Sequence, residues 1–343
     1  MAARFRILSL DGGGIRGIIP AQILVRLEEK LQKKTNNPTA KLSDFFDMIT
    51  GTSTGGILAC MYLAPRKEDA TKSVYSANDV VNFYLKYGGE IFSIPTYHKI
   101  RTLSGLTDEK YPAHNLERIL DMYFGKLELK DLVKPCLITA YDVFESKAHF
   151  FRQHQAKESE GRNFYVKDVA RATSAAPTYF ESPLITSKSG VKYPLIDGGV
   201  FANNPTLCAY AEARQVFKSE DGATISAKEL IIFSLGNGGL TKMELDHNKV
   251  KNFGLIEWIR PLIDIMMSGV SQTVDYQLKQ IYKTESVGSQ YIRIEPELGH
   301  AKSDMGDASP RNLSALQEAG FRAAEKEEND DKLDRLAEML ISR

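Results

Sequence analysis

The sequence of 343 residues has few of the features that mark secreted, metal-binding or membrane-spanning proteins. Its three cysteines, Cys60, Cys136 and Cys208, are far apart in apolar or helical contexts, which favours buried free thiols in a reducing compartment. There is no Cys/His cluster with metal-ligand spacing, and no apolar run approaches the roughly 18 residues of a membrane span. Residues 1–7 lack the apolar stretch of a secretory signal. We expect a cytoplasmic protein, peripheral at membranes at most, unless a signal peptide preceded this sequence.

The sequence also lacks net charge. Lys and Arg together number 44, as do Asp and Glu. No global field therefore attracts nucleic acid or an anionic membrane, and we expect no nucleic-acid partner. With 43% hydrophobic residues the chain can form one large α/β domain or two ordinary ones. Because no repeat or linker divides it, we expect a single domain over 1–343, with a catalytic core at about 4–240 and a mainly helical part at 241–343. The oligomeric state stays open.

Short apolar runs alternate with segments of helical periodicity. Strands are predicted at Phe5–Leu10, 47–51, Leu137–Phe144, His149–Phe151, Tyr193–Ile196 and Leu230–Leu235. Helices are predicted from Pro20 to near Thr35, at 54–63, 77–88, 114–124 and Val166–Thr173, after Asn204-Pro205, and at Glu325–Leu340. This alternation predicts an α/β fold with a mostly parallel central sheet and helices on both of its faces.

The segment 253–282 carries a long apolar stripe. Its members, Leu262, Met266, Val270, Val274, Leu278 and Ile281, fall on one face of a helix. Such a helix either packs on the sheet or forms a lid that faces lipid, and the periodicity allows both.

The most informative motif is Gly51-Thr52-Ser53-Thr54-Gly55, a G-x-S-x-G between a predicted strand and a predicted helix. A serine hydroxyl becomes a useful nucleophile when it is exposed, oriented and served by a base. A sharp turn between strand and helix exposes the hydroxyl, and the small neighbours let the turn close. Ser53 is therefore the candidate nucleophile, with a simple helix-capping turn as the alternative.

A glycine-rich loop, Gly12-Gly13-Gly14-Ile15-Arg16-Gly17, follows the first strand. It fits the G-x-G-x-x-G pattern of dinucleotide-binding proteins, but the acidic residue expected about 20 positions later is missing, because Glu28 and Glu29 lie inside a helical pattern. The other interpretation is an oxyanion hole, in which the N–H groups of Gly12, Gly13 and Gly14 stabilise the charge on an ester oxygen. Arg16 would add positive charge there or form a surface ion pair.

The general base is less clear. His247 and His300 follow Ser53 in the order of an α/β-hydrolase, but both lie in polar stretches that suit solvated histidines. Asp197 ends a predicted strand and precedes Gly198-Gly199, so its carboxyl could face a serine in a partly dry cleft, where its pKa would rise. The alternative is an aspartate that only stabilises a turn.

Together these segments resemble the patatin-like phospholipases. Asp11–Gly17 is similar to the oxyanion loop of that family, Gly51–Gly56 to its nucleophile turn and Asp197-Gly198-Gly199 to its catalytic-aspartate motif. Further resemblance lies in Asp168–Phe180, in Phe233–Gly236 and in Asp304–Gly320, and it is closest to the plant-type patatins. The sequence departs from the plant pattern at Asn237, where those members have threonine, which bears on the local shape of that loop.

The resemblance implies an α/β lipid acyl hydrolase with a dyad of Ser53 and Asp197, acting on phospholipids, lysophospholipids or other acyl lipids. It implies transient contact with a membrane or micelle surface, and neither calcium nor another cofactor. A Ser–Asp–His esterase, a non-catalytic storage or lipid-binding protein and a dinucleotide-binding oxidoreductase are the alternative functions.

Overall fold

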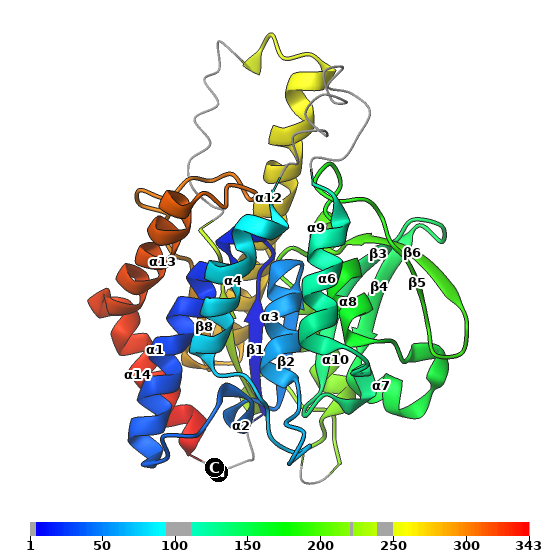
Figure 1. The fold of residues 1–343 in the computed structure, drawn as a ribbon. Coiled ribbons are helices and arrows are strands. Elements are labelled where there is room, and N and C mark those ends of the chain that lie inside the picture. The colour runs from blue at the N-terminus through cyan, green and yellow to red at the C-terminus, as the bar shows by residue number, and fades with distance from the viewer. Residues whose placement is uncertain (1–4, 94–110, 220–221, 239–249, 343) are drawn as a thin grey trace.

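The computed structural model describes residues 5–93, 111–219, 222–238 and 250–342 (Figure 1). Its strands are β1 (Phe5–Leu10), β2 (Met48–Thr52), β3 (Cys136–Asp142), β4 (Lys147–Arg152), β5 (Leu184–Thr186), β6 (Lys192–Asp197), β7 (Leu230–Leu235) and β8 (Tyr291–Ile294). They form one sheet in the order β5-β6-β3-β2-β1-β7-β8, with β4 also beside β3. The block from β3 to β8 in this order is parallel, and β4, β5 and β6 add antiparallel pairs. The predicted mostly parallel sheet is confirmed.

Helices cover both faces of this sheet. They are α1 (Ile18–Thr35), α2 (Leu42–Phe45), α3 (Thr54–Leu63), α4 (Ala77–Ile91), α6 (Ala113–Phe124), α7 (Gln153–Glu158), α8 (Val166–Thr173), α9 (Gly199–Ala202), α10 (Thr206–Val216), α12 (Leu255–Thr284), α13 (Pro310–Glu325) and α14 (Glu327–Ile341).

Two neighbouring residues of β1 pack on opposite faces of the sheet. Ile7 of β1 packs in a core cluster with Ala209 of α10 and Leu278 of α12. The next residue, Leu8, belongs to the larger cluster on the other face, which α1, α3, α4, α6, α8, α13 and α14 complete. Because side chains alternate along a strand, a parallel strand covered on both faces is mainly apolar on both, which is why four of the six residues of Phe5–Leu10 are apolar. The three cysteines are free thiols, as expected; Cys60 and Cys136 are buried, whereas Cys208 is only partly buried.

Strand β3 brings two distant strand ends together. Along one edge it pairs with β4 from Leu137 to Asp142. On its other edge, β2 pairs up to Thr139 in parallel, and antiparallel β6 takes over from Ala140, opposite Asp197. The carboxyl ends of β2 and β6 therefore meet head to head on consecutive residues of β3. Asp197 ends a strand, as the sequence predicts; this strand is antiparallel to β3, and the register of β3 places Asp197 beside the end of β2.

Helix α12 confirms the predicted helix near 253–282. Its second half is held in the core by Val274, Leu278 and Tyr282, whereas its first half rises beyond the sheet in Figure 1. Strand β8, with Arg293, extends the sheet from the chain beyond residue 240, where the sequence analysis placed the end of the catalytic core. In the described part of the chain, no helix combines the length and the apolar character that crossing a membrane requires.

Candidate active site

Ser53 occupies the turn that joins β2 to α3 and is 5% exposed. Its backbone has φ 55° and ψ −124°, a conformation that costs a residue other than glycine about 1–3 kcal/mol. The surrounding structure holds it there: the Ser53 N–H donates to Thr173 Oγ1 at 2.9 Å, and the Thr173 hydroxyl donates to the Thr139 carbonyl on β3 at 2.7 Å. Gly55 lets α3 begin against β1, because a Cβ there would lie 2.8 Å from the Asp11 carbonyl oxygen. The predicted strand–turn–helix around Ser53 is present.

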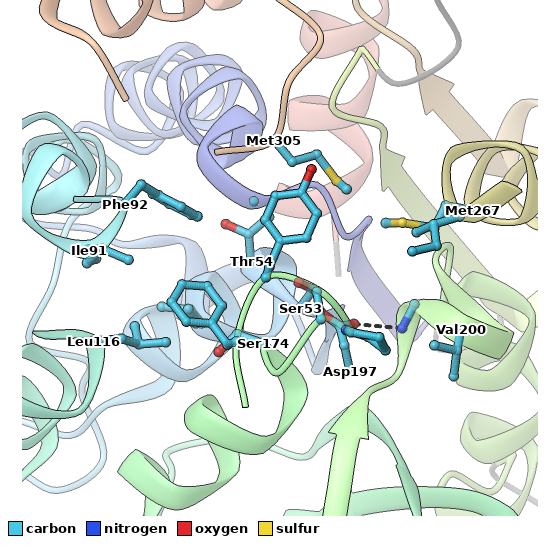
Figure 2. A pocket seen from close by; sticks show the side chains of 18 of the residues that line it. Ser53, Thr54, Ile91, Phe92, Leu116, Ser174, Asp197, Val200, Met267 and Met305 are labelled. Carbon is cyan, nitrogen blue, oxygen red and sulfur yellow. Dashed lines mark hydrogen bonds between the residues drawn. The ribbon is translucent and has the colours of Figure 1, made fainter. Parts of the chain in front are cut away.

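Asp197 lies beside Ser53 at the floor of a pocket (Figure 2) and is 2% exposed. Its Oδ1 accepts the Gly199 N–H at 2.7 Å, whereas Oδ2 is buried with no hydrogen-bond partner among the described residues. Burial raises the pKa of Asp197 to about 7, against opposing interactions with the Ser53 hydroxyl and the Gly199 N–H. The hydroxyl is thus close enough to act on the carboxyl, without forming an aligned hydrogen bond. A carboxyl with this pKa can accept a proton near neutral pH.

The glycine loop passes next to Ser53, but its three amides are not equivalent. The Gly12 N–H donates to the backbone carbonyl of Asn203 at 3.0 Å. This N–H is therefore engaged by the turn after α9, which argues against the expectation that Gly12 supplies an oxyanion donor.

The amides of Gly13 and Gly14 are different. The Gly12 carbonyl accepts from Asn237 Nδ2, and the Gly13 carbonyl accepts from the side chain of Arg16 at 3.3 Å. In a trans peptide the carbonyl and the following N–H point in opposite directions, so the N–H groups of Gly13 and Gly14 point away from these two side chains. Gly14 also needs its φ of 58°, and a Cβ there would meet Met305. Asn237, where the sequence departs from the plant pattern, is one of the residues that hold the loop.

Arg16 lies beside the glycine loop, the first of the two places that the sequence left open. It is 6% exposed, and its guanidinium donates to the carbonyls of Gly13 and Ser303, the latter at 3.2 Å. Within the described residues it forms no ion pair at the surface; it holds the shape of the loop by hydrogen bonds to main-chain oxygen atoms.

Beneath the loop lies a buried ionic cluster that the sequence analysis did not find. Arg293 on β8 donates to both carboxyl oxygens of Asp11, at 3.2 and 2.7 Å, and to Glu295 at 2.6 Å. Ser271 of α12 donates to Asp11 Oδ2 at 3.2 Å. Burial raises the pKa of Glu295 to about 7, and Arg293 opposes this shift. The cluster links β1 and β8 to α12, and the one local signal of it is an arginine inside a short apolar segment, Tyr291–Ile294.

The pocket above Ser53 and Asp197 is almost wholly apolar. It holds about 850 Å³ of space, part of it open to solvent. Ile91, Phe92 and Leu116 line one side, and Val200 and Met267 line the other (Figure 2). Apolar walls with a few polar groups at one end are typical of sites that bind the hydrocarbon part of a ligand.

No histidine is among the described residues that line this pocket. His300 is exposed on the loop before α13, and His247 lies outside the described residues. The glutamates at 28 and 29 are inside α1, and Glu28 accepts hydrogen bonds from the backbone of Leu42 and Ala77. The acidic ribose ligand of a dinucleotide site is not at this position.

Comparison with known proteins agrees with this geometry. Residues 8–210 match the sequence model of the patatin-like phospholipase family. Patatin-like protein 3 of Arabidopsis thaliana is 31% identical, covering 92% of this chain and 79% of its own. Patatin-like protein 2 of the same plant is 32% identical over 93% and 83%. A potato relative, Probable inactive patatin-3-Kuras 1 of Solanum tuberosum, is 29% identical over 98% and 92%.

Among solved structures, VipD from Legionella pneumophila aligns with a TM-score of 0.40 and 11% identity, over 97% of this chain and 67% of that one. A similarity this distant adds nothing to the assignment, which the family match and the plant relatives carry. The chain belongs to the patatin-like phospholipase family.

Proposed function

We propose that the protein is a lipid acyl hydrolase that cleaves acyl esters of phospholipids, lysophospholipids or related lipids with a dyad of Ser53 and Asp197. One observation carries the proposal: a serine in a strained turn adjoins a buried carboxyl that has no cationic partner among the described residues, at the floor of an apolar pocket.

In the first step Ser53 Oγ attacks the acyl carbonyl carbon while its proton passes to Asp197. The C–O bond to the leaving alcohol breaks, and Asp197 returns the proton to that alcohol. In the second step water repeats the sequence: Asp197 takes one of its protons, the water oxygen bonds to the acyl carbon, and the bond to Ser53 Oγ breaks as Ser53 regains its proton. A base with a pKa of about 7 suits both transfers at neutral pH.

The negative charge that develops on the carbonyl oxygen needs donors. We assign this role to the N–H groups of Gly13 and Gly14, because Gly12 is engaged with Asn203. Removing one donor of this kind costs roughly 2.7–4 kcal/mol in other enzymes. Arg16 and Asn237 support the donors by holding the carbonyls on the opposite side of each peptide.

The substrate assignment rests on the apolar pocket and on α12. Leu262, Ile265 and Met266 are 38–49% exposed on the first half of that helix, and Met266 also lines the pocket. Apolar side chains at the mouth of an acyl pocket would insert into a lipid surface while the substrate moves from that surface into the pocket. The helix would then act as the lipid-facing element of the single domain that the sequence analysis expects.

No metal or organic cofactor has a part in these steps. In the described portion of the chain there is no cluster of three or more His, Cys, Asp or Glu side chains suited to a metal ion. We therefore predict that millimolar EDTA leaves hydrolysis unchanged; a loss that calcium restores would contradict a mechanism without metal.

The test measures hydrolysis of p-nitrophenyl butyrate and of phosphatidylcholine vesicles. We expect activity on both, its loss in Ser53→Ala, and wild-type rates in the control Ser314→Ala, which alters an exposed serine on α13. A folded wild-type protein inactive on both substrates would favour a storage or lipid-binding role. Activity that survives Ser53→Ala would remove Ser53 from the mechanism.

A further inference from the structure

Asn203 follows α9 in the turn after Asp197 and is 6% exposed. Its backbone carbonyl accepts the Gly12 N–H at 3.0 Å, and its Nδ2 donates to Ser271 Oγ at 3.2 Å. Its Oδ1 is buried and has no hydrogen-bond partner among the described residues. A buried amide oxygen without a hydrogen-bond donor destabilises the folded protein. Such an atom in a native structure calls for an explanation, which its neighbours can supply.

Hydrogen bonding in the buried ionic cluster determines which end of the Asn203 side-chain amide has no partner. Both oxygens of Asp11 accept hydrogen bonds from Arg293, so Asp11 is an acceptor towards Ser271. Ser271 has a single hydroxyl proton, which it gives to Asp11, and it can then only accept from Asn203. Asn203 must therefore turn Nδ2 towards Ser271 and Oδ1 away from it.

The open oxygen faces the dyad. A Cβ placed on Gly199 would stand 3.1 Å from Asp197 Oδ1, 3.4 Å from Asn203 Oδ1 and 3.4 Å from the Met267 methyl group. Because Gly199 has only a hydrogen atom in this direction, no side chain of its own separates these groups, and both Gly199 and Met267 line the pocket. On its other side Asn203 Oδ1 lies 2.6 Å from the Cβ that Gly12 lacks, and Ser53 Cβ is 3.1 Å from the same point. Two acceptor oxygens, Asp197 Oδ1 and Asn203 Oδ1, thus both lie close to Gly199 at the end of the pocket.

We propose that Asn203 positions the water that hydrolyses the acyl-enzyme, an inference that rests on the proposed function. The water donates one hydrogen bond to the Asp197 carboxyl and the other to Asn203 Oδ1. The proton directed at Asp197 is the one transferred, while the water oxygen forms its bond to the acyl carbon and the bond from that carbon to Ser53 Oγ breaks. The other proton of the water, which is hydrogen-bonded to Asn203 Oδ1, stays on the product acid. Asp197 then returns the proton that it accepted to Ser53.

The second acceptor is needed by water and not by an alcohol. Methanol has a single O–H proton, which goes to Asp197, and its methyl group has nothing to give Asn203. Removing the amide oxygen should therefore slow attack by water more than attack by methanol. A general distortion of the site would slow both nucleophiles alike.

The experiment measures how the acyl-enzyme from p-nitrophenyl butyrate divides between butyrate and methyl butyrate in dilute methanol. For Asn203→Ala we expect the ester-to-acid ratio to rise about fivefold to tenfold, the effect of one lost neutral hydrogen bond. Ser271→Ala keeps the amide but removes the group that orients it, and we expect a smaller rise, about twofold to threefold.

Asn204→Ala is the matched control. Asn204 is also buried and donates weakly to the Ser271 carbonyl at 3.5 Å, but its Oδ1 accepts the Thr206 N–H at 3.0 Å at the start of α10. We expect lower stability and the wild-type ratio.

An unchanged ratio in folded Asn203→Ala overturns the inference while the proposed function stands. If Asn203→Ala does not fold, Ser271→Ala decides, and a wild-type ratio there overturns the inference. A wild-type protein that releases neither product overturns the proposed function itself, which is a separate result.

Discussion

Two buried aspartates at neighbouring strand ends show how differently the fold treats the same group. Asp11 after β1 and Asp197 at the end of β6 are each 2% exposed. Asp11 receives two hydrogen bonds from Arg293 and one from Ser271, whereas one oxygen of Asp197 has no partner in the described structure. Burial raises the pKa of both. The paired carboxyl of Asp11 links β1 to β8 and α12, whereas the unpaired carboxyl of Asp197 is the one that we propose exchanges a proton with Ser53.

The largest difference between the two should appear in catalysis. Asp197→Ala should lower kcat for p-nitrophenyl butyrate by roughly 10⁴–10⁶-fold, as Ser53→Ala should, because each removes one half of the proton transfer. Circular dichroism would check that both variants keep the fold. Near-normal turnover in folded Asp197→Ala would break the comparison, because the unpaired carboxyl would then have no chemical role.

For Asp11 the larger effect should be on stability. Arg293→Met leaves Asp11 and Glu295 buried without their cation, and we expect the free energy of unfolding to fall by about 3–5 kcal/mol. Urea denaturation measures this. Arg118→Met is the control, because Arg118 is 55% exposed in its pair with Glu90 and such pairs are worth about 0–1 kcal/mol. Equal losses in both variants would show that burial does not distinguish these pairs.

A third effect concerns the free energy of unfolding, which should depend on pH through the ionisation of Asp197. Its pKa is about 7 in the folded protein and 3.8 as the ordinary value. A carboxyl whose pKa is raised by folding stabilises the fold below pH 4 and loses that contribution as pH rises through 7. Asp197→Asn cannot ionise, so relative to the wild type it should gain on the order of 3 kcal/mol between pH 4 and pH 8. Urea titrations at several pH values test this, and a difference independent of pH would contradict the raised pKa.

The smallest effect should come from the histidine alternative. His300 is exposed and away from the pocket residues, so His300→Ala should keep kcat within about twofold. His247→Ala should do the same if no triad exists. Loss of activity in either folded variant would replace the dyad with a Ser–Asp–His mechanism.

Local patterns in the sequence predicted most of the elements around the site. The helix at Val166–Thr173 and the strands at Phe5–Leu10 and Leu230–Leu235 have the predicted bounds. These segments depend on apolar periodicity and on nearby glycine and proline, which a sequence shows directly. The turn at Ser53 was predictable for the same reason, since its signal lies within five residues.

What could not be predicted depends on contacts between distant residues. The antiparallel direction of β6 depends on its pairing with distant residues of β3, and no pattern within Lys192–Asp197 encodes it. The engagement of Gly12 with Asn203 and the pairing of Asp11 with Arg293 join residues from opposite parts of the chain. A charged residue inside the short strand Tyr291–Ile294 was the one available signal, because a buried strand rarely carries an arginine without a partner.

The central claim is that Asp197 is the base for Ser53, and the pH dependence of covalent labelling tests it most directly. A fluorophosphonate reacts with an activated serine whatever the lipid substrate. We predict that Ser53 is labelled at a rate that rises with pH to a plateau, with a midpoint near the Asp197 pKa of about 7, and that Asp197→Asn is labelled at least a thousandfold more slowly, roughly as expected for loss of the base. Labelling of folded Asp197→Asn at the wild-type rate would contradict the account.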